Sequence, residues 1–275
     1  MAEEAHRIED TPIIEVEQVR AAYAEQTVLE NLTFHIHRGE IFVIAGGSGC
    51  GKSTLLKHMI GLYQPAEGRM LIDGQNIHAS SGQTRQRILR TFGVAYQSGA
   101  LFGNMTVLQN VRLPMEEFTD LSEEQMDMIA LTKLRLVDME QAAQKLPSEL
   151  SGGMQKRAAI ARAMALDPAI VFLDEPSAGL DPITSADLDE LIVDLNRMLK
   201  MTFVVVTHEL PSIFRIADRV LVLDAKVKTM VALEHPAVLR DSSPNPWVRQ
   251  FFSRMPTGAN ISGANSPEEQ IRSHS

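Results

Sequence analysis

Residues 46–54 read GGSGCGKST, and they directly follow IFVIA at residues 41–45, an unbroken apolar run. Such a run predicts a strand that is buried on both faces, as in a parallel sheet covered by helices. Glycines let main-chain N–H groups turn inward and approach phosphate oxygens that a Cβ would keep away. A helix from about Lys52 to Gly61 would also direct the positive end of its dipole at the anion. The stretch therefore predicts a phosphate-binding loop between a buried strand and a helix.

The loop contains the pattern G-x-x-x-x-G-K-[ST], in which Gly46 and Gly51 are followed by Lys52 and Ser53. In this pattern the lysine supplies a positive charge to the terminal phosphates, and the hydroxyl serves Mg²⁺. A glycine-rich turn that matches by accident is the alternative, but a chance match would rarely fall between a buried strand and a helix. We therefore expect this loop to bind a nucleotide through Gly46, Gly47, Ser48, Gly49, Cys50, Gly51, Lys52, Ser53 and Thr54.

Two later segments, residues 169–173 and 203–206, have the same buried-strand character as the run before the loop. Between them, apolar residues recur at helical spacing, which predicts an amphipathic helix over residues 184–200. A strand, a helix and a strand in this order predict a parallel sheet. Residues 13–19 and 32–36 instead alternate apolar and polar residues, as half-buried antiparallel strands do. The sequence thus predicts an α/β fold with a mostly parallel sheet and an N-terminal antiparallel β layer.

The middle of the chain, from about residue 98 to residue 166, is rich in Met, Leu, Glu and Gln and lacks buried-strand runs. This composition favours helices and predicts an α-helical subdomain inserted into the α/β core. The end of the chain, from about Met255, is rich in Ser, Asn, Gly and Pro, which is typical of disordered segments. We expect a single domain at residues 13–254, with a core of 13–97 and 167–254, a helical insertion at 98–166, and flexible tails at 1–12 and 255–275.

Residues 170–176 read IVFLDEP, an apolar strand that ends in two carboxylates. A parallel sheet presents ligand-binding groups at the carboxyl ends of its strands, so Asp174 is placed to help hold Mg²⁺. Glu175 can act as the base or water-positioning group that phosphoryl transfer requires. The alternative is a polar strand end at which Pro176 stops the ladder. The glycine-rich loop in the same chain favours the catalytic interpretation.

The charge and composition argue against several other classes of protein. A net charge of −9 argues against a nucleic-acid surface, which needs clustered and uncompensated Lys and Arg. The apolar runs are far shorter than the roughly 20 residues that a membrane-spanning helix needs. The N-terminus carries acids at Glu3 and Glu4 and has no apolar core segment, unlike a secretory signal. A single cysteine, Cys50, excludes an internal disulfide framework, so we expect a cytosolic protein.

Residues 150–157 read LSGGMQKR, and this motif resembles the signature of the ATP-binding cassette family, which has the form LSGGQ. Met154 stands where that form most often has Gln. Ser151 can cap a helix, while Gly152 and Gly153 leave its first N–H groups bare, so the segment can bind an anion. In the family it meets the γ-phosphate held by the other subunit, which implies ATP sandwiched between two copies of the chain. An ordinary helix N-cap is the alternative.

Further residues match the family, in the right order, over about residues 13–250. The resemblance implies that Tyr23 stacks on adenine and that Gln97 senses Mg²⁺ and links to the membrane domain. It also implies that SAGLD at residues 177–181 crosses the dimer interface and that His208 contacts the γ-phosphate. Taken singly, Tyr23 could be a packed surface aromatic, Gln97 a solvated loop residue and His208 a polar group at a strand end. Their order along the chain favours the functional interpretation.

Several softer matches indicate one branch of the family. They are QSGALF at 97–102, DPIT at 181–184, THELP at 207–211 and NPWVRQFF at 245–252. These segments are most similar to the ATPases that power MCE-type lipid carriers, such as the bacterial Mla phospholipid transport system. The sequence departs from the usual cassette at residues 226–232, where a Gly-containing turn between strands is expected and none is present. The geometry of the C-terminal hairpin is therefore left open.

The resemblance implies a P-loop NTPase core and an ATPase that energises phospholipid or other lipid transport, with ATP and Mg²⁺ as its ligands. The expected catalytic residues are Glu175, His208 and Lys52. The expected metal ligands are Ser53, Gln97 and Asp174, and nucleotide contacts beyond the loop come from Tyr23, Gln97, Ser151, Gly152 and Gly153. The implied partners are a second copy of the chain, integral-membrane permease subunits and an MCE-type lipid-binding protein, without nucleic acid. The implied location is peripheral, at the cytoplasmic face of the inner membrane.

Two other functions fit part of the pattern. A soluble cassette protein that acts on ribosomes or DNA usually joins two cassettes or carries long coiled-coil insertions, and this chain has one cassette and neither addition. A GTPase or small-molecule kinase would share only the phosphate-binding loop. The guanine-reading pattern Asn-Lys-x-Asp does not occur, and LSGGMQKR would have no explanation. Cell fractionation and nucleotide competition separate these possibilities.

Overall fold

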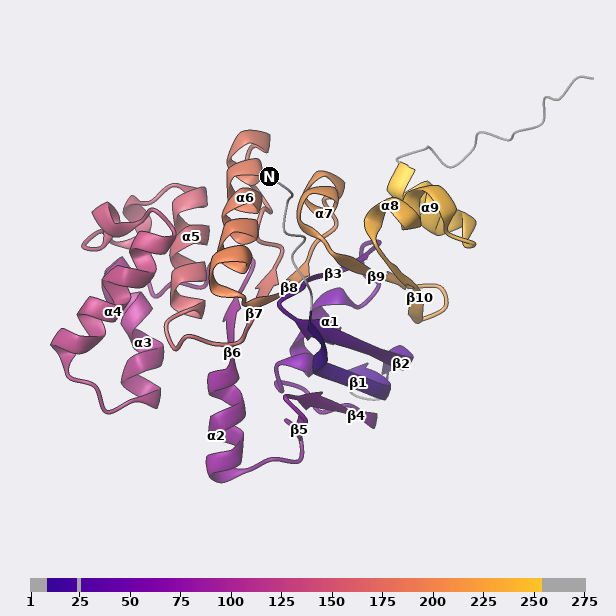
Figure 1. The fold of residues 1–275 in the computed structure, drawn as a ribbon, viewed down its shortest axis with the longest axis horizontal. Helices are drawn as coiled ribbons and strands as arrows, with labels where there is room; N and C mark the ends of the chain where they lie inside the picture. The colour runs from indigo at the N-terminus through magenta and orange to yellow at the C-terminus, as the bar shows by residue number, and fades with distance from the viewer. Residues whose placement is uncertain (1–8, 24–25, 254–275) are drawn as a thin grey trace, which may run out of the picture.

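The computed structural model describes residues 9–23 and 26–253. Its strands are β1 (Glu9–Tyr23), β2 (Gln26–Arg38), β3 (Ile41–Gly46), β4 (Glu67–Ile72), β5 (Gln75–Asn76), β6 (Phe92–Ala95), β7 (Ile170–Asp174), β8 (Thr202–Val206), β9 (Arg219–Asp224) and β10 (Thr229–Glu234). Its α-helices are α1 (Lys52–Met59), α2 (Gly82–Thr91), α3 (Val107–Phe118), α4 (Glu123–Leu136), α5 (Gly152–Ala163), α6 (Pro182–Leu199), α7 (Leu210–Ile216), α8 (Pro236–Ser242) and α9 (Pro246–Ser253). Two short 3-10 turns are η1 (Glu140–Ala142) and η2 (Pro147–Glu149). Figure 1 shows how these elements are arranged.

The larger sheet has the strand order β10-β9-β3-β8-β7-β6, and each neighbouring pair from β9 to β6 is parallel. β3, β7 and β8 closely match the three buried strands that the sequence predicts. β10 runs antiparallel along β9 at one edge. The predicted helix between β7 and β8 is α6, which makes the crossover that parallel strands need. The prediction of a mostly parallel sheet is confirmed.

The smaller sheet is antiparallel and has the order β2-β1-β4-β5. It contains both alternating segments of the sequence, and the inward residues Val16 and Phe34 pair across β1 and β2. The predicted antiparallel layer is therefore confirmed. β1 begins at Glu9, so residues 9–12 of the tail expected at 1–12 belong to a strand. The rest of that tail and the tail expected at 255–275 lie outside the described residues.

The hydrophobic core lies on both faces of the larger sheet because successive residues of a buried strand point to opposite sides. In β3, Val43 and Ala45 belong to a cluster with apolar residues of α3 to α7. Phe42 and Ile44 belong to a second cluster that joins α1 to the smaller sheet. Every side chain of β3 is thereby buried, which explains the unbroken apolar run before the glycine-rich loop.

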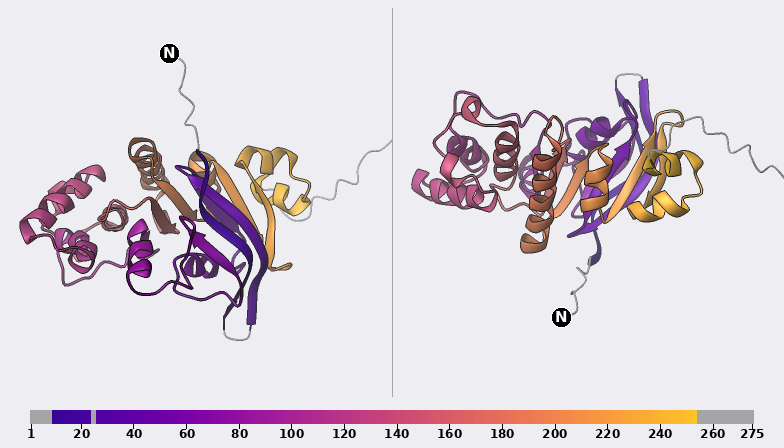
Figure 2. Two further views of the ribbon diagram at one scale, coloured as in Figure 1. Left: turned by 60° about the horizontal axis from the view of Figure 1, so that its bottom comes forward. Right: turned by 90° about the horizontal axis from the view of Figure 1, so that it is seen from above.

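Helices α3, α4 and α5 lie between β6 and β7 in the sequence, and we call them the helical lobe. Figures 1 and 2 show the helical lobe in magenta at one end of the molecule and the antiparallel sheet in indigo toward the other. Thr106 and Ser122 form capping boxes that start α3 and α4. The predicted fold class, including the helical insertion, is confirmed, while its exact limits at residues 98 and 166 stay a prediction. Among the described residues, every helix is too short or too polar to cross a bilayer.

The C-terminal hairpin that the sequence left open is an antiparallel pair of β9 and β10. Lys228 adopts the positive φ, 52°, that glycine usually supplies in such a turn. Asp224 Oδ1 accepts a hydrogen bond from the N–H of Lys226 at 2.8 Å, and the carbonyl of Lys228 accepts one from the N–H of Glu30 at 2.8 Å. These bonds fix the turn against β2 and compensate for the absence of glycine.

Candidate functional site

Four candidate segments follow four neighbouring strands of the larger sheet. Gly46 ends β3, and His208 lies just beyond β8. Asp174 ends β7 with Glu175 directly after it, and Gln97 follows β6. Because these strands are parallel and adjacent, in the order β3-β8-β7-β6, their carboxyl ends meet at one edge of the sheet. The sheet therefore brings together residues that are far apart in the sequence.

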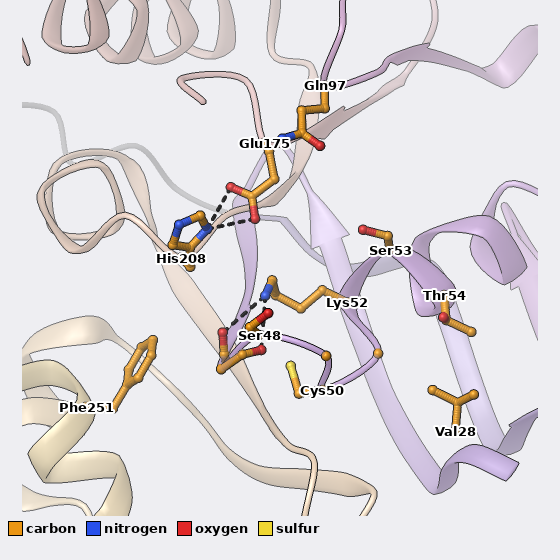
Figure 3. A pocket seen from close by; sticks show the side chains of 14 residues that line it. Val28, Ser48, Cys50, Lys52, Ser53, Thr54, Gln97, Glu175, His208 and Phe251 are labelled. Atoms are coloured by element: carbon orange, nitrogen blue, oxygen red, sulfur yellow. Dashed lines mark hydrogen bonds and ion pairs between the residues drawn. The ribbon is translucent and has the colours of Figure 1, made fainter. Parts of the chain in front are cut away.

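These segments line a pocket of about 540 Å³ at that edge, shown in Figure 3. Its size is typical of a site for a small molecule. Most of its wall is the predicted phosphate-binding loop, completed by side chains from the ends of other elements. The lining residues are Val28, Gly46, Gly47, Ser48, Gly49, Cys50, Gly51, Lys52, Ser53, Thr54, Gln97, Glu175, His208 and Phe251.

Two glycines of the loop are required by its shape. Gly46 has a φ of 146°, and a Cβ there would lie 2.4 Å from the carbonyl oxygen of Leu223. Gly51 has a φ of 101° and would place a Cβ 2.9 Å from Leu29 Cγ. Gly51 is also the N-cap of α1, and no side chain caps that helix. The first N–H groups of α1 are thus left for a ligand at the pocket, as predicted for a phosphate site.

Lys52 bonds to its own loop in this structure. Its ammonium donates hydrogen bonds to the carbonyl oxygens of Gly46 at 3.1 Å and Gly47 at 3.3 Å. These contacts hold the charge over the loop, where Figure 3 shows the side chain extending along the pocket. Phosphate oxygens are stronger acceptors than neutral carbonyls because they carry charge. Lys52 can therefore replace its hydrogen bonds to these two carbonyls with hydrogen bonds to a phosphate group.

The predicted metal ligands supply oxygen atoms, the donors that Mg²⁺ prefers. Ser53 Oγ donates a hydrogen bond to Asp174 Oδ1 at 3.4 Å, so the two candidate ligands lie side by side. Gln97 is exposed and lines the same pocket. Burial, together with the nearby Glu175 carboxylate, raises the pKa of Asp174 above its ordinary value. A bound cation would offset this because it favours the charged carboxylate. The residues present fit a hard divalent cation.

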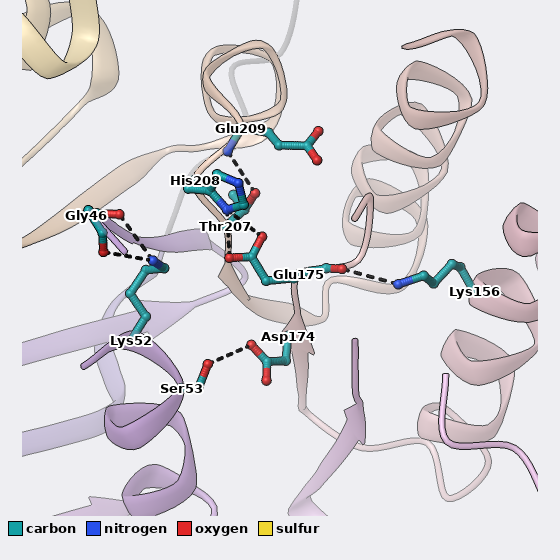
Figure 4. Close-up of polar contacts among 10 residues, drawn as sticks. Gly46, Lys52, Ser53, Lys156, Asp174, Glu175, Thr207, His208 and Glu209 are labelled. Atoms are coloured by element: carbon teal, nitrogen blue, oxygen red, sulfur yellow. Dashed lines mark hydrogen bonds and ion pairs between the residues drawn. The ribbon is translucent and has the colours of Figure 1, made fainter. Parts of the chain in front are cut away.

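Glu175 and His208 interact directly, as Figure 4 shows. His208 Nδ1 lies 2.9 and 3.0 Å from the two carboxylate oxygens of Glu175. This contact corresponds to the tautomer of His208 in which Nδ1 carries the ring proton and donates it to the carboxylate. The Glu175 side chain is 11% exposed and that of His208 is 61% exposed, so the pair reaches from the protein interior into the open pocket. Such a pair can hold a buried carboxylate in one orientation toward a ligand.

The LSGGMQKR segment lies outside this pocket. Ser151 caps α5 by accepting a hydrogen bond from the N–H of Met154 at 3.3 Å, and Ser151, Gly152 and Gly153 do not line the pocket. A Cβ at Gly153 would lie 2.6 Å from Thr184 Cγ2, whereas a Cβ at Gly152 would meet only Leu180 Cδ2, at 3.5 Å. Packing therefore requires glycine at position 153 and not at position 152. The expected contact of this segment with a nucleotide stays a prediction.

Two further expected contacts also stay predictions. Tyr23 is the last residue of β1, but its side chain lies outside the described part of the chain. The SAGLD segment leads into α6, where Asp181 accepts hydrogen bonds from the N–H groups of Ile183 and Thr184, both at 3.1 Å. This cap fixes the direction in which the segment leaves the pocket region.

Phe251 of α9 also lines the pocket, a position that no motif in the sequence predicts. Its ring packs against Trp247 and Phe252, with centroid distances of 5.7 and 5.2 Å. Phe252 packs in turn against Phe214 of α7, the helix that follows His208. Phe251 belongs to the segment NPWVRQFF at residues 245–252, which is far from the glycine-rich loop in the sequence. The sequence alone therefore does not show that Phe251 and the loop lie close together.

Comparisons with known proteins agree with this geometry. The family model described as ABC transporter matches residues 29–178. The chain is 38% identical over 246 residues to the intermembrane phospholipid transport system ATP-binding protein MlaF of Escherichia coli (strain K12), and the match covers 90% of each chain. It is 39% identical over 240 residues to the probable ribonucleotide transport ATP-binding protein mkl of Mycobacterium leprae (strain TN), covering 87% of this chain and 68% of that protein.

A solved structure is also similar. It is the dimeric post-hydrolysis state of the ATP-binding cassette MJ0796 bound to ADP and Pi, with a TM-score of 0.72 and 32% sequence identity. The match covers 81% of this chain and 98% of that chain. The likeness therefore extends to the whole of a nucleotide-binding cassette that has been seen as a dimer.

Proposed function

The chain belongs to the ABC transporter family and is an ABC ATPase subunit, and from this premise we propose that it energises phospholipid transport through a separate membrane permease. The observation that carries the proposal is the pocket at the carboxyl edge of the larger sheet, where the loop at 46–54 meets Glu175 and His208. The match to MlaF, which extends over 90% of both chains, supports a phospholipid cargo.

Binding of ATP begins at the glycine-rich loop. The main-chain N–H groups of residues 46–54 bind the phosphates, aided by the uncapped start of α1. Lys52 gives up its bonds to the carbonyls of Gly46 and Gly47 and donates to phosphate oxygens instead. Tyr23 stacks on the adenine ring. These contacts place the γ-phosphate toward Glu175 on the same pocket wall.

Hydrolysis then depends on Glu175. Its carboxylate orients a water molecule in line with the γ-phosphorus and accepts a proton from it. The water oxygen bonds to phosphorus, the bond from phosphorus to the bridging oxygen breaks, and ADP leaves with that electron pair. His208 fixes the carboxylate through Nδ1–H and presents its exposed ring to the γ-phosphate. Correct placement of these groups supplies most of the rate gain in phosphoryl transfer.

We assign the predicted metal site to Ser53, Asp174 and Gln97, whose oxygen atoms fit Mg²⁺. When bound there, Mg²⁺ would neutralise charge on the phosphate oxygens of ATP. Ser53 and Asp174 already lie within hydrogen-bond distance of each other, so they can hold a cation with little movement.

Two kinds of partner follow from the proposal. A second copy of the chain contributes Ser151, Gly152 and Gly153 to the γ-phosphate of the first, in line with the dimeric state of MJ0796. Permease subunits bind near the Gln97 loop and the helical lobe. The assembly lies at the cytoplasmic face of the inner membrane and includes an MCE-type lipid-binding protein.

The test is to purify the chain with its membrane partners, to identify the lipids that accompany the complex, and to follow Mg-ATP hydrolysis and phospholipid transfer between vesicles. We expect ATP-dependent transfer of phospholipid that is lost in Glu175→Gln. Absence of hydrolysis even with the membrane partners would contradict the ATPase role. Hydrolysis that responds to ribonucleotides and not to phospholipids would instead support the cargo that the name of mkl indicates.

A further inference from the structure

Lys156 reaches from α5 of the helical lobe toward the pocket and is only 9% exposed. Its ammonium donates a hydrogen bond to the main-chain carbonyl oxygen of Gln97. It donates a second one to the main-chain carbonyl oxygen of Glu175 at 3.3 Å, which Figure 4 shows. Both acceptors belong to residues that line the pocket. We propose that Lys156 is a positioning residue that holds the Gln97 loop and the Glu175 turn to the helical lobe. The inference rests on the roles proposed above for Gln97 and Glu175.

Packing alone does not explain why residue 156 carries an ammonium group. Burying it is costly because it loses its water shell, so its hydrogen bonds have to replace that shell. Lys133, on α4 of the same lobe, is also buried and pairs with the carboxylate of Asp167. Lys156 instead uses two neutral carbonyls. An apolar side chain could fill the same space, so the ammonium marks a place where two carbonyls have to be held.

Glu175 needs such support because its backbone is strained. Its φ is 48°, a left-handed conformation that favours glycine, and such conformations persist only where the surroundings fix them. The N–H of Glu175 donates to the carbonyl of Val206 on β8 at 2.8 Å, while its own carbonyl accepts from Ala178 and Lys156. The direction of the Glu175 carboxylate therefore depends on β8 from one side and on α5 from the other.

The same helix holds the Gln97 loop at a second point. Arg162 donates hydrogen bonds to the carbonyls of Gly99 at 2.9 Å and Ala100 at 2.7 Å. α5 also begins at Gly152, so Lys156 lies on the order of 6 Å along the helix axis from the LSGGMQKR glycines. A displacement of that end by a phosphate of the second copy would thus shift Gln97 and Glu175 of this copy. Lys156 thus connects the glycines at the start of α5, which contact the nucleotide of the second copy, to Gln97 and Glu175, which act on the nucleotide bound by the same chain.

The test compares Lys156→Met, Lys156→Gln and Lys133→Met in the full-length chain. Methionine is an unbranched side chain one atom shorter than lysine and donates no hydrogen bond, whereas glutamine restores two N–H donors without the charge. We expect Lys156→Met to lower kcat by about tenfold or more while ATP affinity stays within about twofold, because misplacement of a catalytic group costs rate more than binding. Lys156→Gln should recover kcat to within about threefold of wild type, and Lys133→Met should leave it within about twofold.

The melting temperature of each variant is measured alongside, and Lys156→Ala replaces Lys156→Met if the methionine variant does not fold. The inference is overturned if removing the donor leaves kcat within about twofold of wild type, or if Lys133→Met lowers kcat equally. Glu175→Gln in the same assay separates the two proposals. Near-normal hydrolysis by Glu175→Gln would contradict the proposed function, whereas an inactive Glu175→Gln beside a fully active Lys156→Met would overturn only the role of Lys156.

Discussion

The starts of α1 and α5 are both glycine-rich helix N-termini, yet they differ in what surrounds them. α1 follows Gly51, has no side-chain cap, and opens into a pocket that also contains Glu175 and His208. α5 follows Ser151, which caps it, and its glycines do not line that pocket. An uncapped helix start beside Glu175 and His208 combines free N–H groups with the proposed catalytic side chains, whereas the start of α5 is capped at the N–H of Met154 and lies outside the pocket that contains them.

Under the proposed function, this difference corresponds to a division of labour between two copies of the chain. In that proposal, the α1 region supplies Lys52, Glu175 and His208, and the α5 region supplies only N–H groups that contact the γ-phosphate of the other copy. A single chain would then hold most of one site and a small part of another. Variants that damage each region separately should give distinct results, because only the α1 region is expected to bind ATP without a second copy.

The largest effect is expected from Glu175→Gln, which removes the proposed base from the α1 region. Turnover should fall by roughly 100-fold or more while ATP affinity is retained, because the amide cannot accept the proton of the attacking water. Steady-state hydrolysis and equilibrium nucleotide binding measure the two quantities. Glu209→Gln is the matched control, since Glu209 is a nearby carboxylate that does not line the pocket. Equal losses in both variants would remove Glu175 from its role.

Gly152→Asp tests the α5 region without disturbing its packing. A Cβ at this position meets only Leu180 Cδ2 at 3.5 Å, so the chain should fold normally. The added carboxylate would repel the phosphate of a second copy, and we expect turnover to fall by about 30-fold or more. ATP affinity of the isolated chain should stay unchanged. Met128→Asp places the same charge on the exposed side of α4 and should be neutral, and unchanged turnover in Gly152→Asp would contradict the division between regions.

Phe251→Ala examines the edge of the α1 region that the sequence did not reveal. Loss of the half-buried ring should weaken ATP affinity by about fivefold, equivalent to about 1 kcal/mol of apolar contact. Trp247→Ala is the matched control, because Trp247 packs on the same ring but does not line the pocket. Isothermal titration with ATP distinguishes them, and identical affinities for both variants would show that Phe251 acts only in packing.

The smallest effect on turnover is expected from Asp189→Asn, which removes a buried carboxyl outside both regions. Burial raises the pKa of Asp189 to about 6. Asp189 therefore holds its proton more tightly in the folded protein than in the unfolded chain. Between about pH 4 and pH 6, Asp189 is ionised in the unfolded chain and protonated in the folded protein, so the free energy of unfolding declines as the pH rises through this range. Asparagine stays neutral and avoids this penalty.

Asp189→Asn should consequently be more stable than wild type at neutral pH, by up to about 3 kcal/mol, and the gain should disappear near pH 4. Denaturant unfolding at several pH values measures this difference. Asp187→Asn, which changes an exposed carboxyl of the same helix, serves as the control. A gain that does not vary with pH would exclude burial of Asp189 as its cause.

Local patterns predicted the strands and loops that carry the site. The apolar run at 41–45 and the segment IVFLDEP became β3 and β7, because a strand buried on both faces has to be apolar throughout. The glycine-rich loop followed β3 as predicted, since its shape depends on residues that are adjacent in the sequence. The antiparallel layer was equally visible in the alternation of residues 13–19 and 32–36.

Contacts across the chain were not visible in this way. The position of Phe251 beside the loop and the bonds of Lys156 to Gln97 and Glu175 depend on how distant elements pack. The β9–β10 turn also escaped prediction, because Lys228 adopts a glycine-like φ and the hydrogen bond that its carbonyl accepts from Glu30 comes from a distant strand. Tertiary contacts of this kind override local preference and leave no periodic signal.

Sedimentation velocity of Glu175→Gln with saturating Mg-ATP tests the central claim most directly, alone and in combination with Gly152→Asp. The division of labour between α1 and α5 predicts a dimer with Mg-ATP, a monomer without it, and a monomer with Mg-ATP once Gly152→Asp is added. A chain that stays monomeric with Mg-ATP, with and without its permease, or a dimer that Gly152→Asp leaves intact, would contradict it.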